Sequence, residues 1–247
     1  MKKFLTLWKK ELASHFLSPG AYAVPALFLV VTGLVFWRLA VQNAGSPVTL
    51  SMLLFGPIFF WVMILLIVSL ITMRLFVDER RQGTMETLIT VPLREVQIVL
   101  AKYAGALTFF VAACAPSLAF FFVLQWLHAC GRGGIDWGPI VGGYLILLLT
   151  GAFYISIGLF VSVMSRSHVV AGIACFSILM VAFFSGYFNY VLAGGIATNT
   201  LRYASSVHHV LDFASGLIDT RPIVLNVTGT IFMLFATTQV LQSERWR

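Results

Sequence analysis

Charged side chains that could recognise a partner are concentrated in one short segment of this chain. Residues 78–96, DERRQGTMETLITVPLREV, hold seven of the 25 charged side chains (16 Lys and Arg with 9 Asp and Glu), although the chain is 60% hydrophobic and only 10% charged. Carboxylates and guanidinium groups at this density can form ion pairs with another protein. They could equally form a solvated loop that only fixes which side of a membrane the segment occupies. Charge alone leaves both interpretations open.

Other candidate sites for chemistry are weaker. His208 and His209 could bind a metal ion with Asp212, but adjacent histidines point in different directions on a helix, so ordinary polar residues are the default interpretation. The sequence contains no H-E-x-x-H motif, which argues against an intramembrane metalloprotease. The three cysteines are too far apart for a disulfide framework or a metal site (Cys114, Cys130 and Cys175). We therefore expect neither a metal site nor catalytic residues.

The sequence also lacks a phosphate-binding loop. The pattern G-x-x-x-x-G-K-[S/T] occurs nowhere, and Lys102, the only lysine after residue 10, follows no glycine-rich loop. If the protein depends on nucleotide, the ATPase must be another polypeptide. We expect no cofactor in this chain.

Six apolar segments have the length needed to cross a bilayer, about 20 residues each. The predicted spans are 21–41, 52–75, 100–127, 138–163, 169–192 and 222–242. Pro25, Pro57 and Pro116 fall within them, where neighbouring helices can satisfy the freed carbonyl groups. The sequence thus predicts one all-α, polytopic membrane domain over residues 1–247, with no room for a separate soluble domain.

The N-terminal segment, residues 1–20, predicts an amphipathic helix on the membrane surface. Its apolar stripe has helical spacing (Leu5, Trp8, Leu12 and Phe16), and lysines flank that stripe (Lys2, Lys3, Lys9 and Lys10). Trp8 would lie at the depth of the lipid head groups.

Lysine and arginine positions predict the orientation of the chain. With the N-terminus in the cytoplasm, twelve of these residues lie inside and four lie outside (Arg38, Arg132, Arg202 and Arg221). Both termini and the loop 76–98 are therefore predicted to be cytoplasmic. The net charge of +7 could suggest nucleic acid, but the positions of the charges favour lipid and topology instead.

The acidic residues all lie outside the predicted spans (Glu11, Asp78, Glu79, Glu86, Glu95, Asp136, Asp212, Asp219 and Glu244). Ion-coupled secondary transporters commonly use intramembrane carboxylates, so this distribution disfavours that class. A passive membrane scaffold stays open as the second alternative.

Within the cytoplasmic loop, residues 77–91 can form a short helix that Pro92 would end. The segment 77–103, VDERRQGTMETLITVPLREVQIVLAKY, resembles the cytoplasmic loop of ABC-2 type transporter permeases. It is most similar to the branch that holds the gliding-motility and nitrous-oxide-reductase-maturation permeases. The residues that match are Glu79, Gly83, Thr84, Glu86, Leu88, Thr90, Pro92, Glu95, Lys102 and Tyr103, whereas Ala101 replaces the usual glycine.

A second segment supports this resemblance. Residues 205–224 resemble the family's pattern before the last helix, with matches at His209, Phe213, Gly216 and Asp219, although Val210 replaces an aromatic residue. The region 193–221, which includes His208 and Asp212, would form an extracytoplasmic loop or re-entrant segment that caps the outer end of the pathway.

The resemblance implies a permease subunit of an ATP-binding-cassette exporter in a bacterial cytoplasmic membrane. In such assemblies two permease chains, identical or paralogous, pair above two ATPase subunits, which bind ATP and magnesium. The surface helix, including Lys9 and Lys10, would contact the ATPase together with the loop (Asp78, Glu79, Arg80, Arg81, Gln82, Gly83, Thr84, Met85, Glu86, Leu88, Thr90, Pro92 and Glu95). Membrane lipid and an accessory subunit are further candidate partners. The sequence does not name the substrate.

Overall fold

The regular secondary structure of the described part of the chain is all helical. A computed structural model describes residues 2–17, 20–43, 50–81, 83, 95–128, 136–191, 206–217 and 219–245, and none of these forms a strand. The helices are α1 (Lys2–Leu17), α2 (Gly20–Gln42), α3 (Leu50–Phe55), α4 (Ile58–Thr72), α5 (Val77–Arg81), α7 (Glu95–Cys114), η1 (Ala115–Leu118), α8 (Ala119–His128), α9 (Trp137–Met164), α10 (His168–Val191), α12 (Ser206–Ala214) and α13 (Thr220–Arg245).

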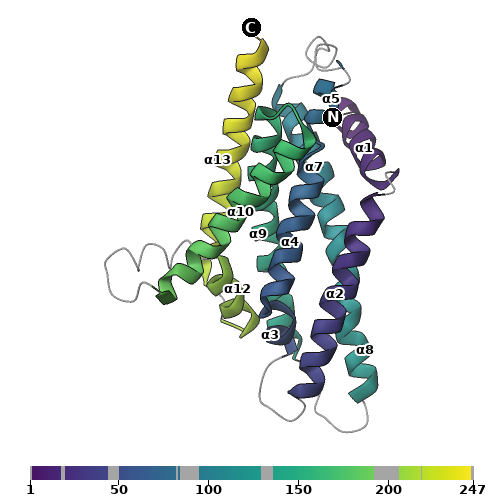
Figure 1. The fold of residues 1–247 in the computed structure, drawn as a ribbon, viewed down its shortest axis with the longest axis vertical. Helices are drawn as coiled ribbons and strands as arrows, with labels where there is room; N and C mark the ends of the chain where they lie inside the picture. Colours follow the sequence, from purple (N-terminus) through teal and green to yellow (C-terminus); the bar gives the residue numbers. More distant parts are fainter. Residues whose placement is uncertain are drawn as a thin grey trace.

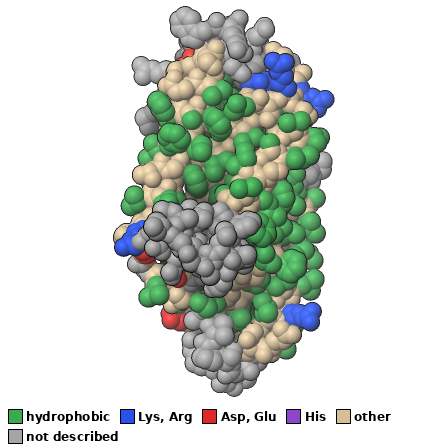
Figure 2. All heavy atoms as spheres, turned by 60° about the vertical axis from the view of Figure 1, so that its left-hand side comes forward, with side chains coloured by type: hydrophobic (Ala, Val, Ile, Leu, Met, Phe, Trp, Pro, Cys, Tyr) green, Lys and Arg blue, Asp and Glu red, His purple; other side chains and the backbone are tan. Residues whose placement is uncertain are grey.

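Five helical segments are long and apolar enough to cross a membrane: Tyr22–Gln42, Ile58–Arg81, Glu95–Trp126, Trp137–Met164 and Thr220–Ser243. They correspond to five of the six predicted spans. The remaining prediction, 169–192, falls on α10, whose apolar part is described only over His168–Phe184 and is shorter than a full crossing. Hydrophobic side chains are spread along the described part of the face in Figure 2, and charged side chains are sparse there.

The long helices run between two ends of the molecule, and α9 is the central one. Figure 1 shows the N-terminus, α1, α5 and the C-terminus at one end, with α3, α8 and α12 toward the other. Helix α9 packs against α13, α12, α4, α10 and α7, and α1 packs against α7. The end that carries α1 and α5 is called the α5 end below.

Two prolines interrupt helices that the sequence predicts as continuous. The predicted span 52–75 is divided into α3 and α4 at Gly56 and Pro57, and the indole nitrogen of Trp61 closes the break by donating to the Phe55 carbonyl at 2.8 Å. The predicted span 100–127 contains the 3-10 turn η1 around Pro116. A proline lacks an N–H and clashes with the preceding turn, which explains both interruptions. Pro25 lies inside α2, as predicted.

Glycines allow the central helix to approach its neighbours closely. Built Cβ atoms on Gly143, Gly151 and Gly158 of α9 would overlap the side chains of Phe55, Phe110 and Thr72, respectively. These three glycines recur at intervals of seven or eight residues and so lie along one face of α9. The close contacts of α9 with α3, α7 and α4 therefore depend on the absence of side chains on this face.

Candidate functional site

Helix α5 is the described start of the charged loop that the sequence predicts to be cytoplasmic. It follows a buried turn, and the amide of Asp78 donates to the Arg74 carbonyl at 3.3 Å. Beyond Arg81, Gly83 has a φ of +67°, a left-handed conformation that ends a helix and that glycine adopts without strain. The predicted continuous helix over 77–91 is therefore wrong. Residues 82 and 84–91 of the predicted segment lie outside the described residues.

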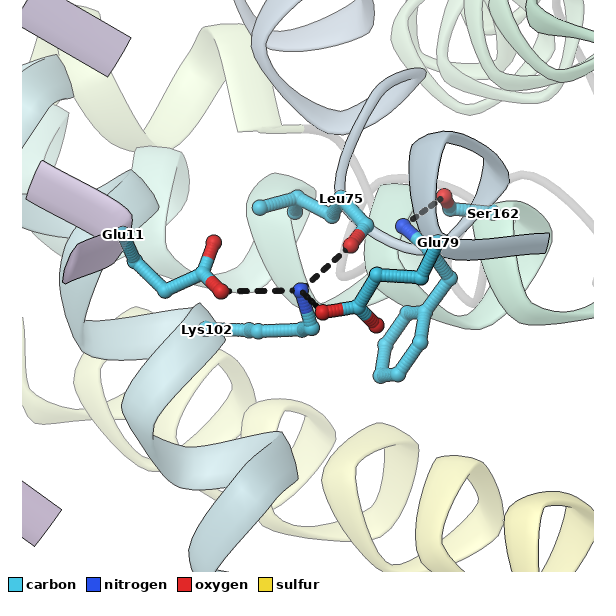
Figure 3. Close-up of polar contacts among 6 residues, drawn as sticks. Glu11, Leu75, Glu79, Lys102 and Ser162 are labelled. Carbon is cyan, nitrogen blue, oxygen red and sulfur yellow. Dashed lines mark hydrogen bonds and ion pairs between the residues drawn. The ribbon is translucent and has the colours of Figure 1, made fainter. Parts of the chain in front are cut away.

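Lys102 of α7 is the centre of a buried ion cluster (Figure 3). Its Nζ lies 3.0 Å from Oε1 of Glu11 in α1 and 2.9 Å from Oε1 of Glu79 in α5. It also donates to the Leu75 carbonyl at 2.6 Å, and it lies 5.1 Å from the centre of the Phe76 ring. Glu11, Glu79 and Lys102 are called the Lys102 cluster below.

The Lys102 cluster satisfies the lysine completely. An ammonium group has three hydrogens to donate, and Lys102 has three acceptors, namely two carboxylates and one carbonyl. The lysine side chain is only 2% exposed, and the two glutamates are 10% and 12% exposed. A buried charge of this kind is tolerated only when it is paired and hydrogen-bonded. The cluster thus fixes α1, α5 and α7 to one another.

Two further contacts attach α5 and the preceding turn to the bundle. Oδ1 of Asp78 lies 3.1 Å from Nε2 of His168 at the start of α10. The amide of Phe76 donates to the hydroxyl of Ser162 in α9 at 3.2 Å, a contact also drawn in Figure 3. The beginning of the charged loop is therefore connected to α1, α7, α9 and α10.

The structure describes only part of the predicted coupling segment. Asp78 and Arg80 are half-buried, Arg81 and Gly83 are exposed, and Glu95 is half-buried in the first turn of α7. Glu79 points into the bundle instead of toward a partner. The other predicted residues lie outside the described part of the chain (Gln82, Thr84, Met85, Glu86, Leu88, Thr90 and Pro92).

Helix α1 forms as predicted, and the structure adds a buried carboxylate to it. On the predicted stripe, Leu5 and Phe16 are exposed, while Trp8 and Leu12 are half-buried. Lys9 and Lys10 are exposed, and Glu11 is buried against α7. A Cβ on Gly105 of α7 would lie 3.0 Å from the Glu11 Cβ, so glycine there permits the close approach. Sequence reasoning missed Glu11, although a lysine within an apolar helix signals that an acidic partner exists.

The fold lowers the pKa of His15 in α1. Its ring stacks on Phe109 of α7, with ring centres 5.6 Å apart. Burial lowers the pKa of His15 below 6.5; Lys102 and Arg74 lower it further, and the carboxylates of Glu11 and Asp78 oppose this. The native protein consequently binds fewer protons at His15 than the unfolded chain does.

This shift predicts a loss of stability in acid. Because the unfolded chain binds the extra proton, stability is complete above pH 6.5 and falls as the pH drops from 6.5 toward the lower native pKa. We expect the melting temperature of the purified protein to decrease between pH 7.5 and pH 5.5, and His15→Phe to decrease less. Phenylalanine keeps the stacked ring and cannot titrate. Equal decreases in the two proteins would contradict this assignment.

Helix α12 carries the second predicted motif at the opposite end of the molecule (Figure 1). Phe213 is buried, and its carbonyl lies so close to Gly142 of α9 that a Cβ there would be 3.1 Å away. The hydroxyl of Ser51 in α3 donates to the Ala214 carbonyl at 2.5 Å. Gly216 has a φ of +90° and ends the helix. The motif thus docks α12 onto α9 and α3.

The polar side chains of this motif that the structure describes show no metal-binding arrangement. Asp212 and Asp219 are exposed, and His209 is half-buried, while the His208 side chain is outside the described part. Oδ1 of Asp219 accepts from the Arg221 amide at 3.1 Å, next to the first residue of α13. Among the described residues, no group of three His, Cys, Asp or Glu side chains could hold a metal ion.

Comparison with known proteins identifies the family. Residues 41–214 match the family model described as ABC-2 family transporter protein, a region that includes α5, Lys102 and α12. No curated protein matches the sequence. The five candidate spans and this match together indicate a multi-pass membrane protein. Because the match covers well over half of its residues, the chain belongs to the ABC-2 family of transporter proteins.

Proposed function

We propose that this chain is the non-catalytic permease subunit of an ATP-binding-cassette exporter, coupled to a separate ATPase through the loop that begins with α5. Membership of the family implies an ABC ATPase partner in general. The observation that carries the proposal is the attachment of α5 and its preceding turn to α1, α7, α9 and α10 through the Lys102 cluster, Asp78 and Phe76. The similarity of 77–103 supports the gliding-motility and nitrous-oxide-reductase-maturation branch.

The proposed topology has six crossings, with both termini on the cytoplasmic side of a bacterial inner membrane. The sixth crossing would be α10, which is 24 residues long. Figure 1 supports an even number, because the two termini lie at the same end of the molecule. The excess of lysine and arginine in the predicted inner loops supports the orientation.

The mechanism follows from the connections of α5. Two ATPase subunits, which bind ATP and magnesium, would press on the loops of two permease chains, identical or paralogous. A displacement of the loop would move Glu79 and with it Lys102 and Glu11, so α7 and α1 would shift together. Asp78 and Phe76 would transmit the same displacement to α10 and α9. ATP hydrolysis would thereby drive export or mechanical work across the membrane.

The structure gives one observation in favour of an ion-coupled transporter as the second candidate. Three acidic residues, Asp78, Glu79 and Glu95, fall within the candidate spans of the structure. All nine acidic residues lie outside the spans predicted from the sequence. Glu79 is also buried. The Lys102 partner and the position at the α5 end favour a structural ion pair over a proton relay through the membrane. ATP-driven activity that persists without a proton or sodium gradient would separate the two candidates.

Charge reversal on the loop tests the proposed function. We expect Arg81→Glu combined with Glu86→Lys to reduce co-purification of the ATPase and its stimulated ATP hydrolysis by about tenfold, as expected when interfacial charge pairs are lost. Arg81 is exposed, so the level of the permease in the membrane should not change. Glu79 is unsuitable for this test, because a lysine there would face Lys102.

Asp219→Lys is the matched control, since Asp219 is an exposed carboxylate between α12 and α13, far along the chain from the loop. It should leave ATPase association unchanged. Normal association and normal stimulated hydrolysis in the double variant would contradict the coupling role of the loop.

A further inference from the structure

A cavity of about 380 Å³ lies beside the Lys102 cluster at the α5 end. Residues of α1, α2, α4, α5 and α7 line it. Its volume is within the range of ligand sites in proteins, about 300–1,000 Å³. Figure 1 shows α1 and α5 at one end of the molecule, and α1 leads from there into α2. The cavity therefore lies where α1, predicted to be an amphipathic surface helix, meets the spans.

The cavity has one apolar wall and one charged wall. Val24 and Pro25 from α2, with Ile67 and Leu70 from α4, form part of the apolar wall. The charged wall has both signs, with Lys10, Arg74 and Lys102 against Glu11, Asp78 and Glu79. An apolar ligand would remove water from the charged wall without replacing its hydrogen bonds. A fully polar solute would leave the apolar wall in contact with water. An amphiphile matches both walls.

The distribution of charge specifies the head group. The Lys102 cluster has one ammonium and two carboxylates, which leaves a formal charge of −1 on its side of the cavity. Lys10 and Arg74 supply two positive charges elsewhere on the same lining, and Asp78, which pairs with His168, supplies one negative charge. The six charged side chains therefore sum to zero, as a zwitterionic head group requires. A primary ammonium would complement the two glutamates, and a phosphate would complement the lysine and arginine.

We propose that this cavity binds one aminophospholipid of the membrane, such as phosphatidylethanolamine, by its zwitterionic head group. The ammonium donates to Glu11 and Glu79, the phosphate accepts from Lys10 and Arg74, and the first methylene groups of the acyl chains lie against α2 and α4. The lipid would fill the space between the surface helix and the spans. This site does not depend on an ATPase partner, so it can be tested on the isolated chain.

Native mass spectrometry of the full chain, released from nanodiscs with equal amounts of phosphatidylethanolamine, phosphatidylcholine and phosphatidylglycerol, tests the proposal. We expect one retained phosphatidylethanolamine per chain. Lys10→Gln and Arg74→Gln should each reduce its retention about fivefold, the effect of one basic residue on an anionic head group. Ser14→Trp, an exposed residue of α1 on the cavity lining, should abolish retention by filling the space.

Arg38→Gln is the matched control, because Arg38 is an exposed arginine of α2 that does not line this cavity. It should retain the lipid normally. Equal retention of phosphatidylcholine would overturn the ammonium contact, since its quaternary nitrogen cannot donate a hydrogen bond. Preferential retention of phosphatidylglycerol, or unchanged retention in Ser14→Trp, would overturn the site itself.

Discussion

Lys102→Met is expected to lower the free energy of unfolding by about 3–5 kcal/mol, the usual cost of removing one partner from a buried ion pair. Methionine fills a similar volume, but it leaves Glu11 and Glu79 side by side in a buried environment without the ammonium that both contact. The Leu75 carbonyl loses its donor as well. Thermal unfolding of the purified protein should show a decrease in melting temperature on the order of 10 °C.

Lys9→Met is the matched control, because it makes the same change at an exposed lysine of α1 that does not line the cavity beside the Lys102 cluster. It should alter the melting temperature by little. The triple variant Lys102→Met, Glu11→Gln and Glu79→Gln should be more stable than Lys102→Met alone, since neutral amides do not need the ammonium. If the triple variant were as unstable as the single one, lost packing and not lost charge pairing would explain the effect.

Gly158→Ala is expected to disrupt the contact between α9 and α4. The added Cβ would overlap Oγ1 of Thr72 and lie 2.7 Å from its Cβ and Cγ2. Rotation about χ1 cannot relieve this, because the Thr72 Cβ does not move in that rotation and both of its branches, Oγ1 and Cγ2, face the glycine. Overpacking of this kind costs about 1–3 kcal/mol or more, although alanine alone favours a helix by about 1 kcal/mol. The yield of monodisperse protein and its melting temperature should both decrease.

Gly172→Ala in α10 is the matched control. The nearest atom to its built Cβ is the sulfur of Met73 at 3.3 Å, which is the flexible end of a long side chain. We expect this variant to be as stable as the original protein or slightly more stable. Equal behaviour of the two alanine variants would mean that α9 and α4 can separate without cost.

Apolar length gave the positions of five spans from the sequence, because the requirement to cross the hydrocarbon acts on each segment separately. The breaks at Pro57 and Pro116 have a local cause, the missing N–H and the ring of each proline. The sequence analysis named both prolines, but it did not predict that they divide the helices. For 77–91 the helical pattern does not reveal that Gly83 adopts a left-handed conformation, which interrupts the helix.

The Lys102 cluster could not be derived from local patterns. Lys102 lies 91 residues from Glu11, and their contact depends on the rotation of α1 against α7. The stripe of Leu5, Trp8, Leu12 and Phe16 predicted one buried face, whereas the glutamate between Trp8 and Leu12 is more buried than any of these four. The available signal was the position of Lys102 within an apolar helix. A charge there indicates that an acidic partner exists, but it does not identify that partner.

The separation of Glu11 and Lys102 along the chain also sets an order of assembly. Synthesis at about 5–20 residues per second delivers the lysine roughly 5–18 s after the glutamate. During that interval Glu11 has no Lys102 to pair with, although α2 and α4 have already been synthesised. Docking of α1 onto α7 through this ion pair therefore has to follow the synthesis of both of these intervening helices.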